Sequence, residues 1–244
     1  MIEQYGIDIS TAQGKIDWDK LARNEHLSFV IIRAAQGTAQ DSAFDRNIKE
    51  ALRTDIPFGL YFASGATTEE GVEAEARFAA EFCEAFHPQF GAWFDMELKK
   101  HAALGKRKIS ALLRLWLEIV GETGTSAGVY TNRNWLKNLI EPAVFEKQDG
   151  ARYPLWYAAY PNIEGKSLTD AWKDNRQKLS YPQAAIWQWT SKGRIDGIST
   201  NVDMNVCYED FAALIGEDET PEEYVTVEEA ARMLSNLGVR GVIL

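Results

Sequence analysis

Several features that mark large classes of protein are scarce or missing in this chain. Only two of its 244 residues are cysteines, Cys83 and Cys207, and no CxxC pair or metal-ligand spacing includes them. This argues against a disulfide framework and favours two buried thiols. No apolar run is long enough to span a bilayer, so we expect no insertion into a membrane. The opening residues, MIEQYGIDIS, lack the basic and apolar segments of a secretory signal peptide.

Positive charge is also scarce. The 26 Lys and Arg residues are outnumbered by 36 Asp and Glu residues, which gives a net charge of −10 at pH 7. Proteins that bind phosphate backbones usually carry a basic patch, so we expect no nucleic acid partner. The histidines, His26, His87 and His101, show no metal-binding spacing, and phosphate-loop, dinucleotide and serine-nucleophile motifs are absent from the sequence. We therefore predict neither a metal ion nor another cofactor.

What the chain does contain is a regular alternation of short apolar segments with amphipathic ones. The apolar segments are rich in β-branched and aromatic residues and are bounded by Gly, Pro, Asn or Asp, which is typical of strands. The predicted strands are Tyr5–Ile9, Phe29–Ala34, Phe58–Ala63, Ala92–Glu97, Gly128–Thr131, Leu155–Tyr160, Ala185–Thr190 and Val202–Asn205. The predicted helices are Trp18–Asn24, Ser42–Arg53, a helix capped by Thr67 and Glu70 that ends at Phe86, Ile109–Ile119, and a polar stretch around Leu168–Leu179. Eight strands with intervening helices predict an α/β fold whose strands close into a parallel barrel.

Acidic residues occur in or at the end of three predicted strands. Asp95 and Glu97 lie two residues apart on one strand, so both side chains should point to the same face. Asp8 closes the first strand and Asp203 lies in the last. In a barrel these carboxyls would gather at the rim where barrel enzymes keep their catalytic groups.

Carboxyls that lie close together in a cleft raise one another's pKa, so that one of them stays protonated and can donate its proton. Cleavage of a glycosidic bond needs such a donor together with a negatively charged partner. The alternative is that these acids merely end their strands and face solvent. We favour the catalytic interpretation because like charges held together in a cleft are costly unless they serve a function.

A longer series of motifs, in a fixed order, resembles one family of enzymes. The motifs are Gly6-Ile-Asp-Ile-Ser10, Ile31-Ile-Arg-Ala-Ala-Gln-Gly37, Asp41-x-x-Phe44-x-x-Asn47, Phe94-Asp-Met-Glu97, Gly128-Val-Tyr-Thr131, Leu155-Trp-Tyr-Ala-Ala-Tyr160, Trp187-Gln-Trp189 and Val202-Asp-Met-Asn205. Over residues 5 to about 212 the chain is similar to the glycoside hydrolase family 25 lysozymes, the Chalaropsis-type and phage endolysin muramidases. One departure is Tyr61-Phe62, where many members carry Tyr-His. This departure puts the detail of the sugar subsites in doubt, but not the activity.

The resemblance implies an irregular TIM-like barrel, (β/α)5β3. It also implies hydrolysis of the β-1,4 bond between N-acetylmuramic acid and N-acetylglucosamine in bacterial peptidoglycan. Glu97 resembles the general acid, and Asp95 resembles the partner that stabilises positive charge or orients the acetamido group of the substrate. Asp8 and Asp203 resemble the supporting acids. Because acids two residues apart are poorly arranged to flank a sugar from both faces, we favour the substrate's own N-acetyl oxygen over an enzyme carboxylate as the nucleophile.

Other polar and aromatic side chains are candidates for binding the sugar. The expected substrate-binding residues are Arg33, Tyr61, Tyr130, Trp156, Tyr160 and Gln188. For each aromatic residue, packing in the core is at least as good an interpretation as contact with a sugar ring. For Arg33 a structural salt bridge is an equal alternative.

The chain divides into three predicted parts. Residues 1–215 form the barrel, residues 216–224 form an acidic linker, and residues 225–244 form a short C-terminal helical tail with Thr226 and Glu229 as its capping box. About twenty residues cannot bury a core of their own. We expect the tail to begin a cell-wall-binding or oligomerisation module, which allows self-association.

Two other functions compete with the muramidase interpretation. A chitinase-like β-N-acetylglucosaminidase has similar acids, but its fuller motif carries acids and glycine where this chain reads Gly91-Ala-Trp-Phe94. A catalytically silent wall-binding barrel has no need for four acids. Since no signal peptide is visible, we expect the protein to wait in the host cytoplasm for holin-type release, or to be secreted by another route, before it acts on the wall.

Overall fold

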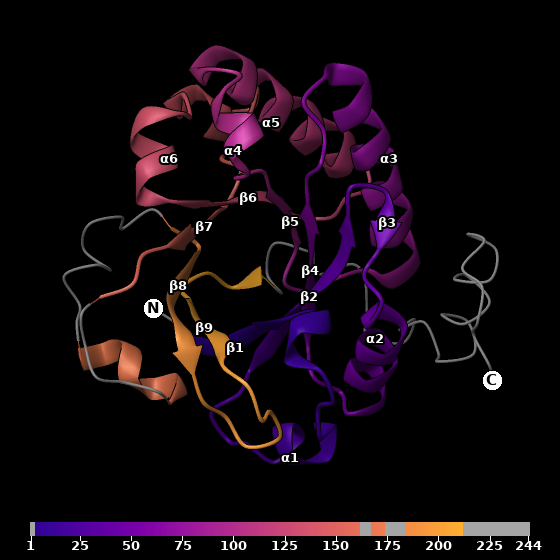
Figure 1. The fold of residues 1–244 in the computed structure, drawn as a ribbon, viewed down its shortest axis with the longest axis vertical. Helices are drawn as coiled ribbons and strands as arrows, with labels where there is room; N and C mark the ends of the chain where they lie inside the picture. The colour runs from indigo at the N-terminus through magenta and orange to yellow at the C-terminus, as the bar shows by residue number, and fades with distance from the viewer. Residues whose placement is uncertain (1–2, 162–166, 174–183, 212–244) are drawn as a thin grey trace.

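Eight strands close into a barrel in the computed structural model, which describes residues 3–161, 167–173 and 184–211 (Figure 1). The barrel strands are β1 (Gln4–Ile9), β2 (Phe29–Gln36), β4 (Phe58–Ala63), β5 (Ala92–Asp95), β6 (Ala127–Asn132), β7 (Leu155–Ala158), β8 (Ile186–Gly193) and β9 (Val202–Cys207). Their order is β1-β9-β8-β7-β6-β5-β4-β2, and pairing between β1 and β2 closes the ring. The two-residue strand β3 (Ala39–Gln40) pairs only with β2.

The prediction that all barrel strands run parallel is wrong for one strand. Strands β1, β2 and β4 to β8 run parallel to their neighbours within that series, whereas β9 is antiparallel to both β1 and β8. The reason is the short connection between β8 and β9. No helix lies in it, and a chain that turns back directly pairs antiparallel, whereas a parallel crossover needs a dozen or more residues.

In the part of the chain that the structure describes, six helices lie outside the barrel, and Figure 1 shows α2, α3, α5 and α6 arranged around it. They are α1 (Trp18–Ala22), α2 (Phe44–Arg53), α3 (Glu69–Phe86), α4 (Lys99–Ala102), α5 (Lys106–Gly121) and α6 (Arg133–Asn138). Three short 3-10 helices are η1 (Thr11–Gln13), η2 (Pro142–Phe145) and η3 (Leu168–Lys173). The prediction of Thr67 as the cap of α3 is wrong by one residue, because the Thr68 side chain accepts the hydrogen bond from Gly71 N. Helices α4 and α6 are too short to show an apolar period, and the sequence did not predict them.

Side chains alternate between the two faces of the barrel wall, and this alternation positions the site. On β5, Phe94 points outward and stacks on Trp116 of α5, with the ring centroids 4.8 Å apart. Trp93 points inward, where it meets Trp156 and Phe211 inside the barrel. Asp95, two residues after Trp93, therefore lies on the inner face as well.

The interior leaves no room for a side chain at Gly128 of β6. A Cβ atom there would lie 2.5 Å from the ring of Trp93 and 2.8 Å from the carbonyl oxygen of Pro154. Since the backbone oxygen cannot move aside cheaply, glycine at this position lets the large ring of Trp93 fill the barrel.

Three predicted parts of the chain lie outside the described residues: the end of the barrel at 212–215, the linker at 216–224 and the tail at 225–244. The same holds for the second half of the predicted polar helix, of which the first half is η3. Within the described ranges, no helix combines the length and the apolar character that crossing a bilayer requires.

Candidate active site

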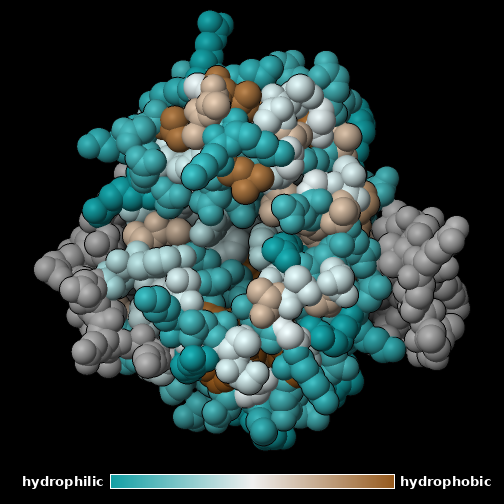
Figure 2. Space-filling view, viewed as in Figure 1, coloured by the Kyte–Doolittle hydropathy of each residue, from teal (hydrophilic) through white to brown (hydrophobic). Residues whose placement is uncertain are grey.

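A pocket of about 150 Å³ opens at the rim of the barrel. The face shown in Figure 2 is mostly hydrophilic and is hollowed near its centre, over the barrel strands. The pocket is lined by Asp8, Tyr61, Asp95, Glu97, Tyr130, Trp156, Tyr160, Gln188 and Asp203. Nine of the ten predicted site residues thus line one cavity, although they come from seven different parts of the barrel wall. A wider depression of about 730 Å³ between α1 and the loop from β8 to β9 contains none of them.

The strand pairing explains how the four acids meet. Asp8 on β1 and Asp203 on β9 are direct partners in the antiparallel ladder. Asp203 lies near the start of its strand and not at its end, but because β9 is reversed, its start reaches the rim where the parallel strands end. Strand β5 ends at Asp95, so Glu97 lies beyond the strand, which corrects the prediction that both acids lie on it.

Among the described contacts, Asp8 is the carboxylate of the pocket with the most hydrogen bonds. Its Oδ2 accepts hydrogen bonds from Gln188 Nε2 at 2.9 Å and from Asn205 Nδ2 at 2.8 Å, and Asp203 also bonds to it. Burial raises the pKa of Asp8 to about 6, while the three hydrogen bonds hold it down. At neutral pH Asp8 is therefore the ionised member of its pair with Asp203.

The two amides that bind Asp8 have only one possible orientation. The ionised Asp8 carboxylate can only accept, so the NH2 group of Gln188 must face it, which leaves Gln188 Oε1 to accept from the hydroxyls of Tyr130 at 3.0 Å and Tyr160 at 2.7 Å. Asn205 Oδ1 accepts from Trp156 Nε1 at 2.8 Å, which turns its NH2 group the same way. Asn205 was not among the predicted site residues. The signal that would have found it is its spacing of two from Asp203, which places both on one strand face.

Neither Asp95 nor Asp203 accepts hydrogen bonds from two amides as Asp8 does in the described part of the chain. Burial and then the charges of Glu97 and Asp8 raise the pKa of Asp95 to about 8, against the opposing charge of Arg33. Among the described residues, Asp95 Oδ1 is a buried oxygen without a hydrogen-bond partner. Burial and the charge of Asp8 likewise raise the pKa of Asp203 to about 8. Both groups are therefore mostly protonated at neutral pH.

Glu97 is partly buried at the mouth of the pocket. Burial raises its pKa, and a hydrogen bond from Asn132 opposes that rise. The donor is Asn132 Nδ2, which lies 3.0 Å from Glu97 Oε2. Asn132 was not predicted, because a single Asn at the end of a strand carries no recognisable motif. All four carboxyls of the pocket thus have a raised pKa, but Asp8 is ionised at neutral pH while Asp95 and Asp203 are mostly protonated. Charged and neutral carboxyls side by side are what acid catalysis at near-neutral pH requires.

The structure distinguishes among the predicted aromatic subsites. Trp156 is only 1% exposed and meets Tyr61 and Tyr130 edge to face, so it forms the floor of the pocket and offers no free ring face to a sugar. Tyr160 is 52% exposed and stands at the mouth of the pocket. Of these aromatic side chains, Tyr160 is the one with a surface available for stacking.

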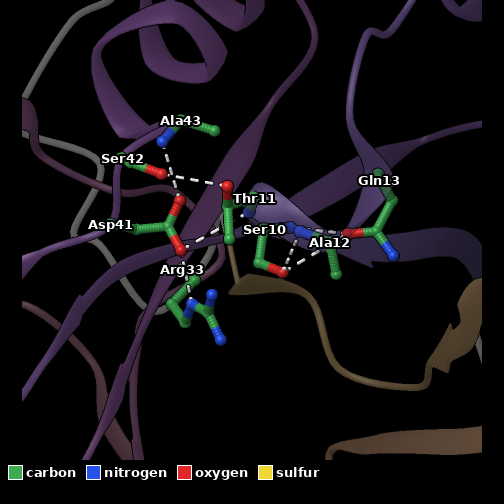
Figure 3. Close-up of polar contacts among 8 residues, drawn as sticks. All are labelled: Ser10, Thr11, Ala12, Gln13, Arg33, Asp41, Ser42 and Ala43. Atoms are coloured by element: carbon green, nitrogen blue, oxygen red, sulfur yellow. Dashed lines mark hydrogen bonds and ion pairs between the residues drawn. The ribbon is translucent and has the colours of Figure 1, made fainter.

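Arg33 is the predicted site residue that does not line the pocket. Its Nε donates to Asp41 Oδ2 at 2.6 Å, and Figure 3 shows that ion pair beside the turn after β1. The Asp41 carboxylate is almost fully buried and also accepts from Ala43 N at 2.9 Å. Figure 3 also shows the neighbouring capping box, in which Ser10 N donates to the side chain of Gln13 at 2.8 Å. The salt bridge expected as the alternative for Arg33 is present, and the charge of Arg33 opposes the rise in the pKa of two pocket residues, Asp95 and Tyr61.

Comparison with known proteins identifies relatives of the chain. The sequence profile described as Glycosyl hydrolases family 25 matches residues 7–198. Lysozyme M1 of Streptomyces globisporus is 23% identical over 216 residues, which cover 82% of this chain and 66% of the lysozyme.

Solved structures give the same fold. The catalytic domain of endolysin ply40 from bacteriophage P40 of Listeria monocytogenes has a TM-score of 0.63 and 27% identity, and the match covers 88% of this chain and 98% of that domain. The modular autolysin LytC from Streptococcus pneumoniae, solved with a synthetic peptidoglycan ligand, has a TM-score of 0.66 and 23% identity. That match covers 84% of this chain and 47% of LytC, so the chain spans about half the length of the autolysin.

Proposed function

Because the chain belongs to glycosyl hydrolases family 25, we propose that this glycoside hydrolase acts on the glycan strands of bacterial peptidoglycan. The bond cut is the β-1,4 bond between N-acetylmuramic acid and N-acetylglucosamine. The observation that carries the proposal is the meeting of Asp8, Asp95, Glu97 and Asp203 in one pocket. The lysozyme and endolysin names of its relatives, and the peptidoglycan ligand bound to LytC, support the choice of substrate.

Glu97 is assigned the role of general acid. It is the acid at the mouth of the pocket, and burial raises its pKa, which favours the protonated form. In the first step its proton passes to the glycosidic oxygen as the bond from that oxygen to the anomeric carbon breaks. In the second step the same carboxylate takes a proton from the water that attacks the anomeric carbon, so Glu97 is regenerated.

Asp95 is assigned the role of orienting the substrate's acetamido group. Its Oδ1 is a buried acceptor without a described partner, and an acetamido N–H is a donor of the right kind to fill that position. With the N–H held, the acetamido oxygen attacks the anomeric carbon as the leaving group departs, and the later attack by water returns the acetamide. Substrate assistance of this kind predicts retention of the anomeric configuration, and an inverted first product would contradict it.

Asp8 and Asp203 support the transition state from the opposite wall. Asp8 is ionised and held by fixed amides, so its negative charge stabilises the positive charge that develops on the sugar ring without any rearrangement. Asp203 in its neutral form can donate a hydrogen bond to Asp8 or to a sugar hydroxyl. Tyr160 is assigned to a sugar subsite, and Gln188 acts through Asp8.

The proposal also covers the form of the barrel, the C-terminal part of the chain and the place where the protein acts. We assign it the (β/α)5β3 form of the barrel, with residues 216–224 as a linker and residues 225–244 as the start of a wall-binding or oligomerisation module. The place of action is the bacterial cell wall, reached by holin-type release or by another secretion route. The absence of a cofactor remains a prediction.

The decisive experiment compares wild type with Glu97→Gln on purified peptidoglycan. Mass spectrometry of the wild-type digest should show fragments with a muramic acid reducing end. The variant should lose at least about 100-fold in rate, which is the usual contribution of a general acid, while its circular dichroism and wall binding stay unchanged. The matched control is Glu81→Gln, which changes an exposed glutamate on α3 and should keep full activity. Unchanged lysis by Glu97→Gln would contradict the assignment.

The competing substrates are tested in the same assay. Chitin oligomers offered beside peptidoglycan should be cut slowly or not at all, whereas faster cleavage of chitin would favour the chitinase-like alternative. Wall binding without any release of fragments by the wild type would favour the catalytically silent barrel.

A further inference from the structure

Asn132, the last residue of β6, makes two different contacts with the two ends of its side-chain amide. Its Nδ2 donates to Glu97 Oε2 at 3.0 Å. Its Oδ1 accepts from Asn134 N at 3.0 Å and from Trp135 N at 3.2 Å, so Asn132 is also the N-cap of α6. One side chain therefore joins the beginning of a helix to the predicted catalytic acid.

The helix fixes which end of the amide faces Glu97. The first N–H groups of a helix have no partner inside the helix, and a capping oxygen satisfies them. If the amide were flipped, its NH2 group would oppose the N–H groups of Asn134 and Trp135, and its oxygen would oppose the Glu97 carboxyl. Both capping bonds would be lost at once, so the donor end of Asn132 is held toward Glu97.

We propose that Asn132 is a positioning residue that holds Glu97 in one rotamer and directs its acidic proton to Oε1. Because Oε2 already accepts the amide hydrogen, Oε1 is the oxygen left to carry the proton that the glycosidic oxygen receives. This inference rests on the proposed role of Glu97 as general acid. It adds a residue, and the position of a proton, that the four acids alone do not define.

A second contact holds the backbone next to Glu97. Leu98 N donates to Nδ1 of His101 at 3.2 Å, and His101 is fully buried on the short helix α4. The bond requires an unprotonated Nδ1, and burial lowers the pKa of His101, which favours that state. With the backbone fixed by His101 and the carboxyl fixed by Asn132, Glu97 has little freedom to turn away from the pocket.

The electrostatic surroundings of Glu97 make the Asn132 contact decisive. The titratable groups that line the pocket with Glu97 are Asp8, Tyr61, Asp95, Tyr130, Tyr160 and Asp203. All are acids, and in the described part of the chain no cation forms an ion pair with Glu97. Within that same part, Asn132 is the only hydrogen-bond donor to the Glu97 carboxyl. Its loss therefore removes the contact that stabilises the ionised form.

The experiment separates the cap from the contact with Glu97. Asn132→Ser keeps a capping oxygen but has no second group to reach Glu97, and Asn132→Asp keeps the cap while placing a second carboxyl beside it. Asn132→Ala removes both functions. Thr68→Ala is the matched control, because it removes the cap of α3 and touches no residue of the pocket.

We expect kcat to fall about tenfold in Asn132→Ser, and the alkaline limb of the kcat/KM profile to move upward by roughly one pH unit. The direction follows because a carboxylate without its donor holds its proton to higher pH. Asn132→Asp should move that limb further, since it adds negative charge. Both variants should keep a Tm close to that of wild type. Thr68→Ala should lower the Tm by a few degrees and leave the profile unchanged.

A second measurement does not depend on activity. Carbon-13 NMR follows the titration of the Glu97 carboxyl, with its signal assigned by its absence in Glu97→Gln. In Asn132→Ser the titration midpoint should move upward with the kinetic limb. An unchanged midpoint would overturn the inference. A midpoint that moves while the activity profile stays fixed would support the contact but refute Glu97 as the acid, so the two failures are distinguishable.

Discussion

Replacing Asp95 with asparagine should make the protein more stable relative to wild type as the pH rises from 5 to 7. In the folded protein burial and then the neighbouring charges raise the pKa of Asp95 to about 8, from an ordinary value of 3.8. Between pH 5 and 7 the folded chain therefore carries a proton on Asp95 that the unfolded chain has released. The stability that this proton contributes is fully present below pH 3.8 and is lost as the pH rises through about 8.

The size of the effect follows from the number of protons. One extra proton bound by the folded state lowers the free energy of unfolding by about 1.4 kcal/mol for each pH unit, which amounts to roughly 2.7 kcal/mol between pH 5 and 7. This slope does not depend on the folded pKa as long as that pKa stays above 7. Asparagine has nearly the same shape and cannot titrate. The difference in unfolding free energy between Asp95→Asn and wild type should therefore grow by that amount.

Urea denaturation, followed by the fluorescence of the eight tryptophans, measures the difference at pH 5, 6 and 7. Asp196→Asn is the control, because Asp196 is exposed on the loop between β8 and β9. Its difference from wild type should be nearly the same at all three pH values. A difference for Asp95→Asn that does not change with pH would refute the protonated state of Asp95 and the account of the pocket that depends on it.

Two further substitutions test the fixed amide and the packed interior. Gln188→Leu removes a donor from the buried Asp8 carboxylate, so we expect the unfolding free energy to fall by about 1–3 kcal/mol and kcat to fall at least tenfold. Normal values in urea denaturation and in the hydrolysis assay would show that Asp8 does not need this donor. Gly128→Ala places a methyl group 2.5 Å from the Trp93 ring, and it should lower the unfolding free energy by about 1–3 kcal/mol. Thermal denaturation compares this variant with the control Gly121→Ala, whose new methyl group would meet nothing within 4 Å and should not lower the Tm. An equal Tm for the two variants would refute the packing argument.

The sequence predicted the barrel strands well because their signal is local. Segments such as Phe58–Ala63 alternate or concentrate apolar residues over a few positions, and this pattern depends only on neighbours along the chain. The direction of β9 and the existence of α4 and α6 were missed. The direction of β9 depends on the length of the connection between β8 and β9. Helices α4 and α6 are too short for their apolar residues to show a helical period.

The acids of the site were also predictable, since Asp8, Asp95, Glu97 and Asp203 each lie in a motif of recognisable spacing. The amide of Gln188 was predicted as well, but the amides of Asn132 and Asn205 were not. Asn132 acts on a residue 35 positions away, and Asn205 acts on one 197 positions away. The spacing of two from Asp203 was a signal for Asn205, but Asn132 had none. A single Asn is compatible with a turn, a cap or a surface position, and only a partner brought close by folding distinguishes these roles.

The sequence by itself determined which residues can exchange protons and which segments form strands, because both properties belong to side-chain types and short-range order. Only the tertiary structure decided the protonation state of each acid. Asp8 stays ionised because three hydrogen-bond donors converge on it, whereas Asp95 stays neutral because one of its oxygens is buried without a described donor. The same carboxyl group thus takes two different states, since the energy of a charge depends on the atoms around it and those atoms come from distant parts of the chain.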